Sequence, residues 1–424
     1  MNNGKAGMLT VLQNRDFLAL WSSQLVSKIG DNFAVVAALV LINDVARASG
    51  FALIAVGVAV TLPQLFALAS GVLIDRFSRK AVMIVTDILR AGVILLALLV
   101  QEPGHLWLLY LVAFGVMGLG ALYVPARNAS VPNMVPEEHL LTANALIQAT
   151  ELVSLIVGSS LATLIISLTS TGTAFVVDAV TFALSGVILI PAHIPQGKLP
   201  VSMAAPRGEF RRFWASFVEG VHYIGSNRYL LQLMAITTVA TLGLSATVLL
   251  AAFYFNRLFG LETALLGLLQ AMEGIGMAIG ALLISAYASW ARSRQIVSVT
   301  MIVLGVGILI VGVTKDYWLV LVGALIVGLC VVSARTTLAA MTQALVPDVQ
   351  RGRVESAMVT VIGLGTMGAL IMAGILGDLL GPESVFIVTG IVVLIAGIAS
   401  IFALREAEER LRNGLDIDLP PPFE

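Results

Sequence analysis

Long apolar runs follow one another along the whole chain, separated by short polar segments. Most hold about 20 mostly apolar residues, which at 1.5 Å per residue lets a helix cross a hydrocarbon core of about 30 Å. The pattern therefore predicts an all-α polytopic membrane protein with twelve transmembrane helices. The predicted spans are 17–42, 51–74, 81–100, 106–126, 140–168, 173–194, 229–255, 263–289, 295–314, 317–340, 354–379 and 384–404.

A short charged turn interrupts the apolar pattern between the second and third predicted spans. Its charged residues are Asp75, Arg76, Arg79 and Lys80. Charged side chains are strongly disfavoured at the centre of a bilayer, so this turn must lie where the lipid ends. We interpret it as a membrane-surface hairpin between two spanning helices.

The composition agrees with this pattern and excludes other classes of protein. The chain is 58% hydrophobic and 12% charged, and its mean hydropathy is +0.98. This balance leaves no room for a soluble domain of ordinary size. A formal net charge of −1 gives no indication of nucleic-acid binding. The single cysteine, Cys330, excludes an intramolecular disulfide.

The basic residues are distributed unevenly between alternate loops. One side of the predicted topology holds 18 of the 24 Lys and Arg residues, whereas the other holds Arg47, Arg257 and Lys315. Because cytoplasmic loops carry the excess of basic residues, we predict that both termini are cytoplasmic. The polar segment 1–15 is not followed by a short apolar core with a small-residue cleavage site, so we expect the first span to be retained.

The longest polar break divides the twelve spans into six and six. We predict an N-terminal six-helix bundle, a cytoplasmic linker, a C-terminal six-helix bundle and a cytoplasmic tail, over 1–194, 195–228, 229–405 and 406–424. Aromatic residues and arginines at 210–218 favour a short amphipathic helix on the inner leaflet. Similar Val-Pro-acid motifs end at Glu137 and Asp348, after the fourth and tenth spans, and indicate parallel repeats around a midplane site.

Several motifs together resemble the major facilitator superfamily of membrane transporters. The turn reads Gly71-x-x-x-Asp75-Arg76-x-x-Arg79-Lys80 and matches the superfamily signature at every fixed position. Further likeness lies in Asp87-Ile88-Leu89-Arg90, Pro125-Ala126-Arg127, Ala143-Asn144-Ala145-Leu146 and Arg351-Gly352-Arg353-Val354. These motifs are similar to those of the branch that holds bacterial macrolide and multidrug exporters and the catecholate siderophore exporter. The resemblance implies a multi-pass monomer of the bacterial plasma (inner) membrane, working by alternating access between two bundles.

The resemblance also implies a gating role for the charged turn. The gating motif consists of Gly71, Asp75, Arg76, Arg79 and Lys80. In the superfamily this loop is thought to hold the cytoplasmic gate shut, and Asp75 can accept hydrogen bonds from a helix N-terminus such as that near Arg353. The alternative, that the charges only follow the positive-inside rule, does not explain Asp75. The equivalent turn at 286–294 contains no acid, so any latch is asymmetric.

Ionisable residues within the predicted spans are candidate sites, because such residues are costly in lipid and are usually functional or paired. The candidates for proton or substrate binding are Asp31, Glu151, Glu273 and Arg335. Glu151 and Glu273 lie at similar depths in equivalent spans, and a desolvated carboxyl there would hold a proton that a cationic substrate could displace. The alternatives are hydrogen bonds to neighbouring helices and, for Asp31, an i,i+3 ion pair with Lys28.

Three further intramembrane residues are predicted to be structural. Asp87 and Arg90 form a candidate charge pair within the third span, and Asp178 lies alone in the sixth. Proton-coupled exporters of the superfamily commonly carry a Gly-Pro pair in the fifth span, where this chain has Gly158 followed by Ser159. Because the kink that proline imposes is not expected here, proton antiport is left open.

No enzymatic motif accompanies these features. The four histidines are scattered near span ends and loops, and the sequence contains neither a Walker-type phosphate loop nor a metal-ligand cluster. We therefore expect no enzymatic activity, no cofactor and no metal.

The motifs together favour one function and leave two alternatives open. We expect a secondary transporter that exports amphipathic, drug-, macrolide- or siderophore-like molecules, as in multidrug efflux, with protons as a candidate coupling ion and with membrane lipid as its other partner. Residues 27–32 are also similar to the first span of lysophospholipid flippases of the same superfamily, so a lipid flippase stays open. A membrane sensor or scaffold without transport is a more distant alternative.

Overall fold

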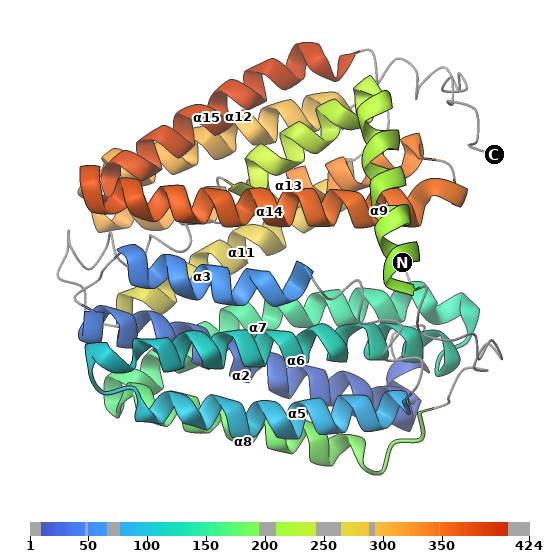
Figure 1. Ribbon diagram of the computed structural model, residues 1–424, viewed down its shortest axis with the longest axis vertical. Coiled ribbons are helices and arrows are strands. Elements are labelled where there is room, and N and C mark those ends of the chain that lie inside the picture. The colour runs from blue at the N-terminus through green and yellow to red at the C-terminus, as the bar shows by residue number, and fades with distance from the viewer. Residues whose placement is uncertain are drawn as a thin grey trace. The chain divides into compact units, whose positions relative to one another are not determined.

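The computed structural model describes residues 10–46, 50–65, 77–194, 209–242, 264–287, 293–346 and 348–405. Every regular element in these ranges is a helix (Figure 1). Internal contacts divide the chain into two compact units. Unit 1 comprises Met1–Pro206 and Leu261–Ala271, and unit 2 comprises Arg207–Gly260 and Met272–Glu424. The predicted bundle, linker and tail boundaries stay predictions.

Unit 1 is built around a long first helix. Its described helices are α2 (Arg15–Ala46), α3 (Gly50–Leu65), α5 (Arg79–Leu95), α6 (Leu106–Ser130), α7 (Leu140–Leu168) and α8 (Thr171–Leu189), and a 3-10 turn, η1 (Leu96–Leu99), extends α5. Helix α2 packs against α7 and α8, while α5 packs against α6 and α8 and α3 packs against α6. The side chains of α2 therefore meet those of two helices far away in sequence.

Unit 2 begins with a helix in the predicted linker. Its described helices are α9 (Glu209–Ser226), an apolar helix over Arg228–Leu242, α12 (Ser293–Val313), α13 (Tyr317–Leu345), α14 (Asp348–Leu380) and α15 (Pro382–Ala403). Helix α11 (Ala264–Tyr287) begins in the part assigned to unit 1 and continues in unit 2. Helix α12 packs against α13 and α15, and α14 packs against α9 and α15.

Ten helices in the described ranges are long and apolar enough to cross a membrane. They correspond to ten of the twelve predicted spans. The second and seventh predicted spans are represented by α3, with 16 residues, and by the shorter helix Arg228–Leu242. Their remaining predicted residues, 66–74 and 243–255, lie outside the described residues, so the twelve-helix count and the orientation stay predictions.

Short polar side chains begin several of these helices. The Ser78 hydroxyl accepts a hydrogen bond from the backbone N–H of Ala81, and Ser170 accepts one from Thr173 at 3.2 Å. The Asp316 carboxylate accepts one from Trp318 at 2.8 Å. Each bond satisfies a backbone donor that the first helical turn leaves unpaired. At the joint between α14 and α15, Gly381 has a φ of 86°, a conformation that glycine adopts without steric strain.

Small residues bring the helices of unit 2 close together. A Cβ atom on Gly305 would lie 2.9 Å from the Gly390 carbonyl oxygen, so α12 and α15 are in backbone contact. The hydroxyls of Ser298 and Ser400 also meet between these helices, 2.7 Å apart. A Cβ atom on Gly328 of α13 would overlap the backbone carbonyl of Glu273 in α11. Such small-residue contacts are typical of helices associating in lipid.

Candidate functional site

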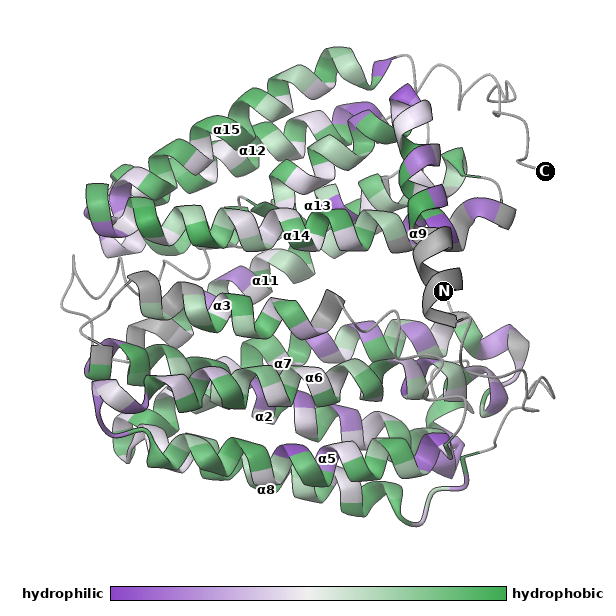
Figure 2. Cartoon of the chain, viewed as in Figure 1, coloured by the Kyte–Doolittle hydropathy of each residue, from purple (hydrophilic) through white to green (hydrophobic). Residues whose placement is uncertain are grey.

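A shared ion pair occupies the middle of α2. The Lys28 ammonium lies 3.3 Å from an Asp31 carboxylate oxygen, one turn along the same helix, and 3.6 Å from a Glu151 carboxylate oxygen in α7. Figure 2 shows hydrophilic residues within helices such as α2 and α5 that are otherwise largely hydrophobic. The expected Lys28–Asp31 ion pair is therefore present, and the contribution of Glu151 is an addition that sequence reasoning missed.

Close packing of α2 against α7 makes this sharing possible. A Cβ atom on Gly158 would lie 2.8 Å from the Ile29 carbonyl oxygen, so any larger residue would push the helices apart. The Asn32 side-chain amide donates to the carbonyl oxygens of Lys28 at 2.8 Å and Ser154 at 3.0 Å. Helix α7 runs without interruption through the serine at the proline position, Ser159.

Glu151 and Glu273 lie in different surroundings, although the sequence places them at similar depths. The Glu151 side chain is 46% exposed, whereas Glu273 is 9% exposed. Within the described residues, Glu273 has no hydrogen bond or ion pair. The Glu151 carboxylate is thus accessible and paired, while the Glu273 carboxylate is buried among apolar groups. Whether either binds a proton or a substrate stays a prediction.

Arg335, the fourth candidate, lies on α13 and is exposed. The described part of the chain gives it no ion pair. The structure therefore does not bring Arg335 together with any of the three candidate acids within the described residues. Its predicted contact with an anionic substrate stays a prediction.

The Asp87–Arg90 pair is buried where three helices of unit 1 meet. The Arg90 guanidinium lies 3.7 Å from Asp87 and donates from Nε to the Val116 carbonyl of α6 at 3.1 Å. It also lies over the rings of Tyr123 and Phe182, at 5.9 and 4.9 Å from their centroids. This geometry, with a cation held by a carboxylate, a carbonyl and two aromatic faces, is what a structural pair requires.

The gating motif is described in part. Gly71, Asp75 and Arg76 lie outside the described residues. Arg79 donates to the Ala129 carbonyl at the end of α6, at 2.7 Å, and Lys80 donates to the Ile190 carbonyl that follows α8, at 2.6 Å. Basic groups are favourable at helix C-termini, where carbonyls are left unpaired. These two residues therefore join helix ends within unit 1, and the latch role of the motif stays a prediction.

The start of α14 makes a contact that the sequence did not suggest. The Arg353 guanidinium pairs with the Glu219 carboxylate of α9. A Cβ atom on Gly220 would overlap the Arg353 carbonyl, so the two helices touch through their backbones at this point. The Arg353 side chain thus binds α9, and the predicted contact of this helix N-terminus with Asp75 stays a prediction, since Asp75 lies outside the described residues.

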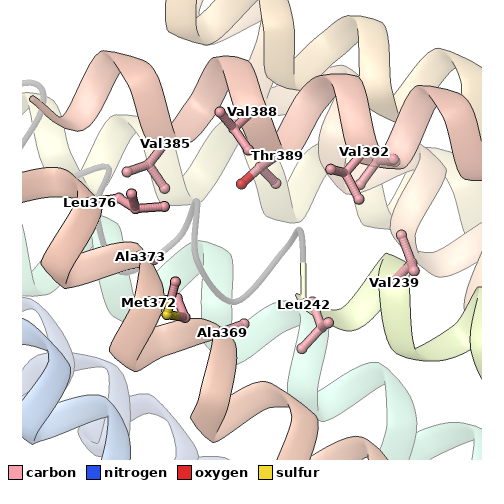
Figure 3. A pocket seen from close by; sticks show the side chains of 11 residues that line it. Val239, Leu242, Ala369, Met372, Ala373, Leu376, Val385, Val388, Thr389 and Val392 are labelled. Carbon is pink, nitrogen blue, oxygen red and sulfur yellow. The ribbon is translucent and has the colours of Figure 1, made fainter. Parts of the chain in front are cut away.

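A small apolar cavity of about 160 Å³ lies within unit 2 (Figure 3). Helices α14 and α15 and the helix Arg228–Leu242 line it, and the Thr389 hydroxyl supplies its polar group. Its lining side chains are Val239, Leu242, Ala369, Met372, Ala373, Leu376, Val385, Val388, Thr389, Val392 and Val393. This lining suits an apolar group and holds no candidate site residue. Elsewhere, the described residues contain no group of three side chains able to hold a metal ion.

Comparison with known proteins places these features in a family. A family model described as transmembrane secretion effector matches residues 6–421. Macrolide efflux protein A of Streptococcus pyogenes is 24% identical over 388 residues, 89% of this chain and 93% of that protein. Multidrug efflux pump Tap of Mycobacterium bovis is 27% identical over 417 residues, 95% of this chain and 97% of that protein.

Solved structures of low identity share the fold. A POT family transporter in complex with 5-aminolevulinic acid superposes with a TM-score of 0.72 at 12% identity, covering 93% of this chain and 96% of that one. A bacterial homolog of the human lysosomal transporter Spinster gives a TM-score of 0.67 at 14% identity, covering 94% of this chain and 98% of that one.

Proposed function

We propose that this chain, which belongs to the transmembrane secretion effector family of major facilitator transporters, exports amphipathic small molecules from the cytoplasm. The observation that carries the proposal is that relatives named for efflux match nearly the whole chain. Family and structural relatives are transporters rather than enzymes. The substrate class we infer is drug- or macrolide-like, and we place the protein in the bacterial inner membrane as a monomer with cytoplasmic termini.

Alternating access with proton exchange is the mechanism we propose. Lys28 is held by two carboxylates on different helices, and Glu151 is the more exposed of the two. A cationic substrate that binds Glu151 would displace the Lys28 ammonium toward Asp31 and alter the protonation of nearby carboxyls. Glu273 would provide a second carboxyl in unit 2. Asp75 would hold the cytoplasmic gate shut, as the gating motif implies.

Transport assays test the substrate class. Cells that express the chain should grow in higher concentrations of erythromycin and ethidium than cells carrying an empty vector. A lysophosphatidylcholine uptake assay run beside them tests the flippase alternative. Uptake of the lysolipid without drug protection would overturn our proposal. Neither drug protection nor lipid uptake, at a verified expression level, would favour a sensor or scaffold.

Neutralising substitutions test the coupling. In vesicles, erythromycin-driven proton flux should fall at least about tenfold in Asp31→Asn, Glu151→Gln or Glu273→Gln if that carboxyl exchanges the proton, equivalent to about 1.4 kcal/mol. Wild-type flux in all three would exclude them as coupling residues.

Asp75→Asn tests the latch role of the gating motif. This substitution should impair transport while leaving membrane insertion intact, and normal transport at wild-type expression would contradict the latch.

A further inference from the structure

Four carboxyl groups and three basic groups form one charged cluster in unit 1. The carboxyl groups are Asp31, Asp87, Glu151 and Asp178, and the basic groups are Lys28, Arg90 and Arg127, which interacts electrostatically with Glu151. An unbalanced ion is expensive in a medium of low dielectric, where several kcal/mol separate its charged and neutral forms. The cluster as described is therefore short of one positive charge.

Each basic group of the cluster is already engaged with another residue. Lys28 pairs with Asp31 and Glu151, and Arg90 pairs with Asp87. Arg127 donates to the Asn128 side-chain oxygen at 2.9 Å. Within the described residues, Asp178 has no basic group at ion-pair distance. Asp178 is therefore the carboxyl group of this cluster that has no cation of its own among the described residues.

The surroundings of Asp178 offer its carboxylate almost no compensation. The residue is fully buried near the middle of α8, and Oδ2 has no hydrogen-bond partner. Oδ1 is 3.4 Å from the Thr181 hydroxyl, but that hydroxyl has a shorter contact, 2.8 Å, with the Asp178 backbone carbonyl. Since a hydroxyl has one proton to donate, the carboxylate receives little from it.

Helix α2 closes the remaining side of this carboxyl group. A Cβ atom on Gly30 would collide with Thr181 Oγ1 and Asp178 Oδ1, so the bare backbone of α2 lies directly against them. The helices packed against α8 carry further charged groups of the cluster, namely Lys28 and Asp31 on α2, Asp87 and Arg90 on α5, and Glu151 on α7. Asp178 interacts electrostatically with Asp31 and Arg90.

We propose that Asp178 is a proton-binding residue of unit 1, whose proton supplies the positive charge that the cluster lacks. A single free carboxylate oxygen suits a proton, whereas a sodium ion would need several oxygen ligands. On release, the O–H bond of Asp178 breaks, its electron pair stays on the carboxylate, and the proton passes to water or to Asp31. The step reverses on uptake. Only the exchange of this proton for substrate rests on the proposed function.

Infrared spectroscopy of the purified full chain in lipid tests the site without any substrate. The experiment uses the Glu273→Gln protein as its parent. This substitution removes Glu273, the other buried acid that has no partner in the described residues, so that it cannot contribute a band. At neutral pH we expect the carbonyl band of one protonated carboxylic acid, shifted in D₂O and lost in Asp178→Asn. A parent without the band, or a band that persists in Asp178→Asn, would overturn the proposal. If the band disappears when NaCl is added at constant pH, the carboxyl group binds sodium in place of the proton, and this result would also overturn the proposal.

A second substitution keeps the test decisive if Asp178→Asn does not fold. Lys28→Met removes one positive charge from the cluster, so a second carboxyl should become protonated and the band area should rise about twofold. The matched control is Arg79→Gln, which removes a positive charge from a helix end outside the cluster. An unchanged area in Lys28→Met, or an equal rise in Arg79→Gln, would contradict the charge balance.

Transport separates this inference from the proposed function. With erythromycin as the probe, the proton release that follows substrate addition to the wild-type protein should be lost in Asp178→Asn. Proton release at the wild-type level would overturn the coupling role of Asp178. If the wild-type protein does not transport erythromycin but the Asp178-dependent band is present, the substrate class is wrong and the proton site is supported.

Discussion

The two units stabilise their interiors by different means. In unit 1, charged side chains join helices: Lys28 of α2 pairs with Glu151 of α7, Arg90 of α5 donates to Val116 of α6, and Asp87 of α5 accepts from Ser185 of α8. In unit 2, the described helices meet through glycines and paired serines, as at Gly305 and Ser298, and line an apolar pocket. The stability of an ion pair changes when a proton or a charged ligand binds, whereas the stability of close backbone packing changes with the volume of the side chains at the contact. Unit 1 is therefore the unit suited to sensing charge.

The largest expected effect comes from breaking the ion pair that is most deeply buried. Arg90→Met leaves the Asp87 carboxyl group buried among three helices without its cation, and should destabilise the protein by about 3–5 kcal/mol. The apparent melting temperature of the protein in detergent, followed by size-exclusion chromatography, measures this loss. The double variant Asp87→Asn/Arg90→Met removes both charges and should recover much of it. Wild-type melting in Arg90→Met would show that ions do not hold unit 1 together.

A volume change in unit 2 should have the next largest effect. Gly328→Ala introduces a methyl group that would overlap the Glu273 backbone carbonyl, so α11 and α13 must separate. We expect this overpacking to lower the free energy of unfolding by about 1–3 kcal/mol. The control is Gly368→Ala, where a Cβ atom meets nothing within 4 Å and the better helix propensity should stabilise α14 slightly. Equal melting temperatures for the two variants would refute the packing argument.

The helix ends of unit 1 should give a smaller effect. Arg79→Gln removes a charged donor from the Ala129 carbonyl, a partly buried contact, and should lower stability by about 1 kcal/mol. Lys80→Gln removes an exposed contact with Ile190 and should change less. The comparison needs only thermal melting curves of the two variants beside the parent. A larger loss in Lys80→Gln would reverse our ranking of these contacts.

The smallest expected effect concerns the ion pair at the helix ends of unit 2. Arg353 and Glu219 have side chains that are 40% and 32% exposed, and such pairs contribute about 0–1 kcal/mol. Glu219→Gln should therefore melt within a few degrees of wild type at low salt and together with it at about 1 M salt, where screening is strong. A large fall in the melting temperature of Glu219→Gln that persists in high salt would show that the stability of unit 2 also depends on an ion pair.

Much of the fold could be predicted because lipid leaves the backbone few choices. An apolar run of spanning length must satisfy its own N–H and C=O groups, and a helix does so. The helix ends were less predictable, since helices continue past the apolar run. Helix α14 begins at Asp348, before its predicted start at 354, and α13 ends at Leu345, beyond 340.

The candidate site was predictable only where it depends on spacing within one helix. Lys28 and Asp31 are three residues apart and must share a face of α2, so their ion pair could be expected. The addition of Glu151 depends on how α7 is rotated, which Gly158 and Asn32 determine through contacts far apart in sequence. Nothing in the sequence indicated the apolar cavity, because its eleven lining residues are of the same types as residues at any lipid-facing position.

The exposed tryptophans offer a clue to internal symmetry that the charge pattern does not contain. Trp107 and Trp318 are 61% and 72% exposed and each is the second residue of its helix, α6 or α13. Their separation, 107 to 318, equals that of the Val-Pro motifs at 136 and 347. The same offset therefore recurs at both ends of these two helices, as parallel repeats require.

The shared position of Lys28 also has an electrical consequence. Its ammonium lies between Asp31 on its own helix and Glu151 on another. Moving one elementary charge through the whole transmembrane field changes its energy by about 2.3 kcal/mol per 100 mV. Any shift of the ammonium along the membrane normal, from one carboxylate toward the other, covers part of that field. A voltage effect on which carboxylate holds the lysine is expected in proportion to the difference in depth between Asp31 and Glu151.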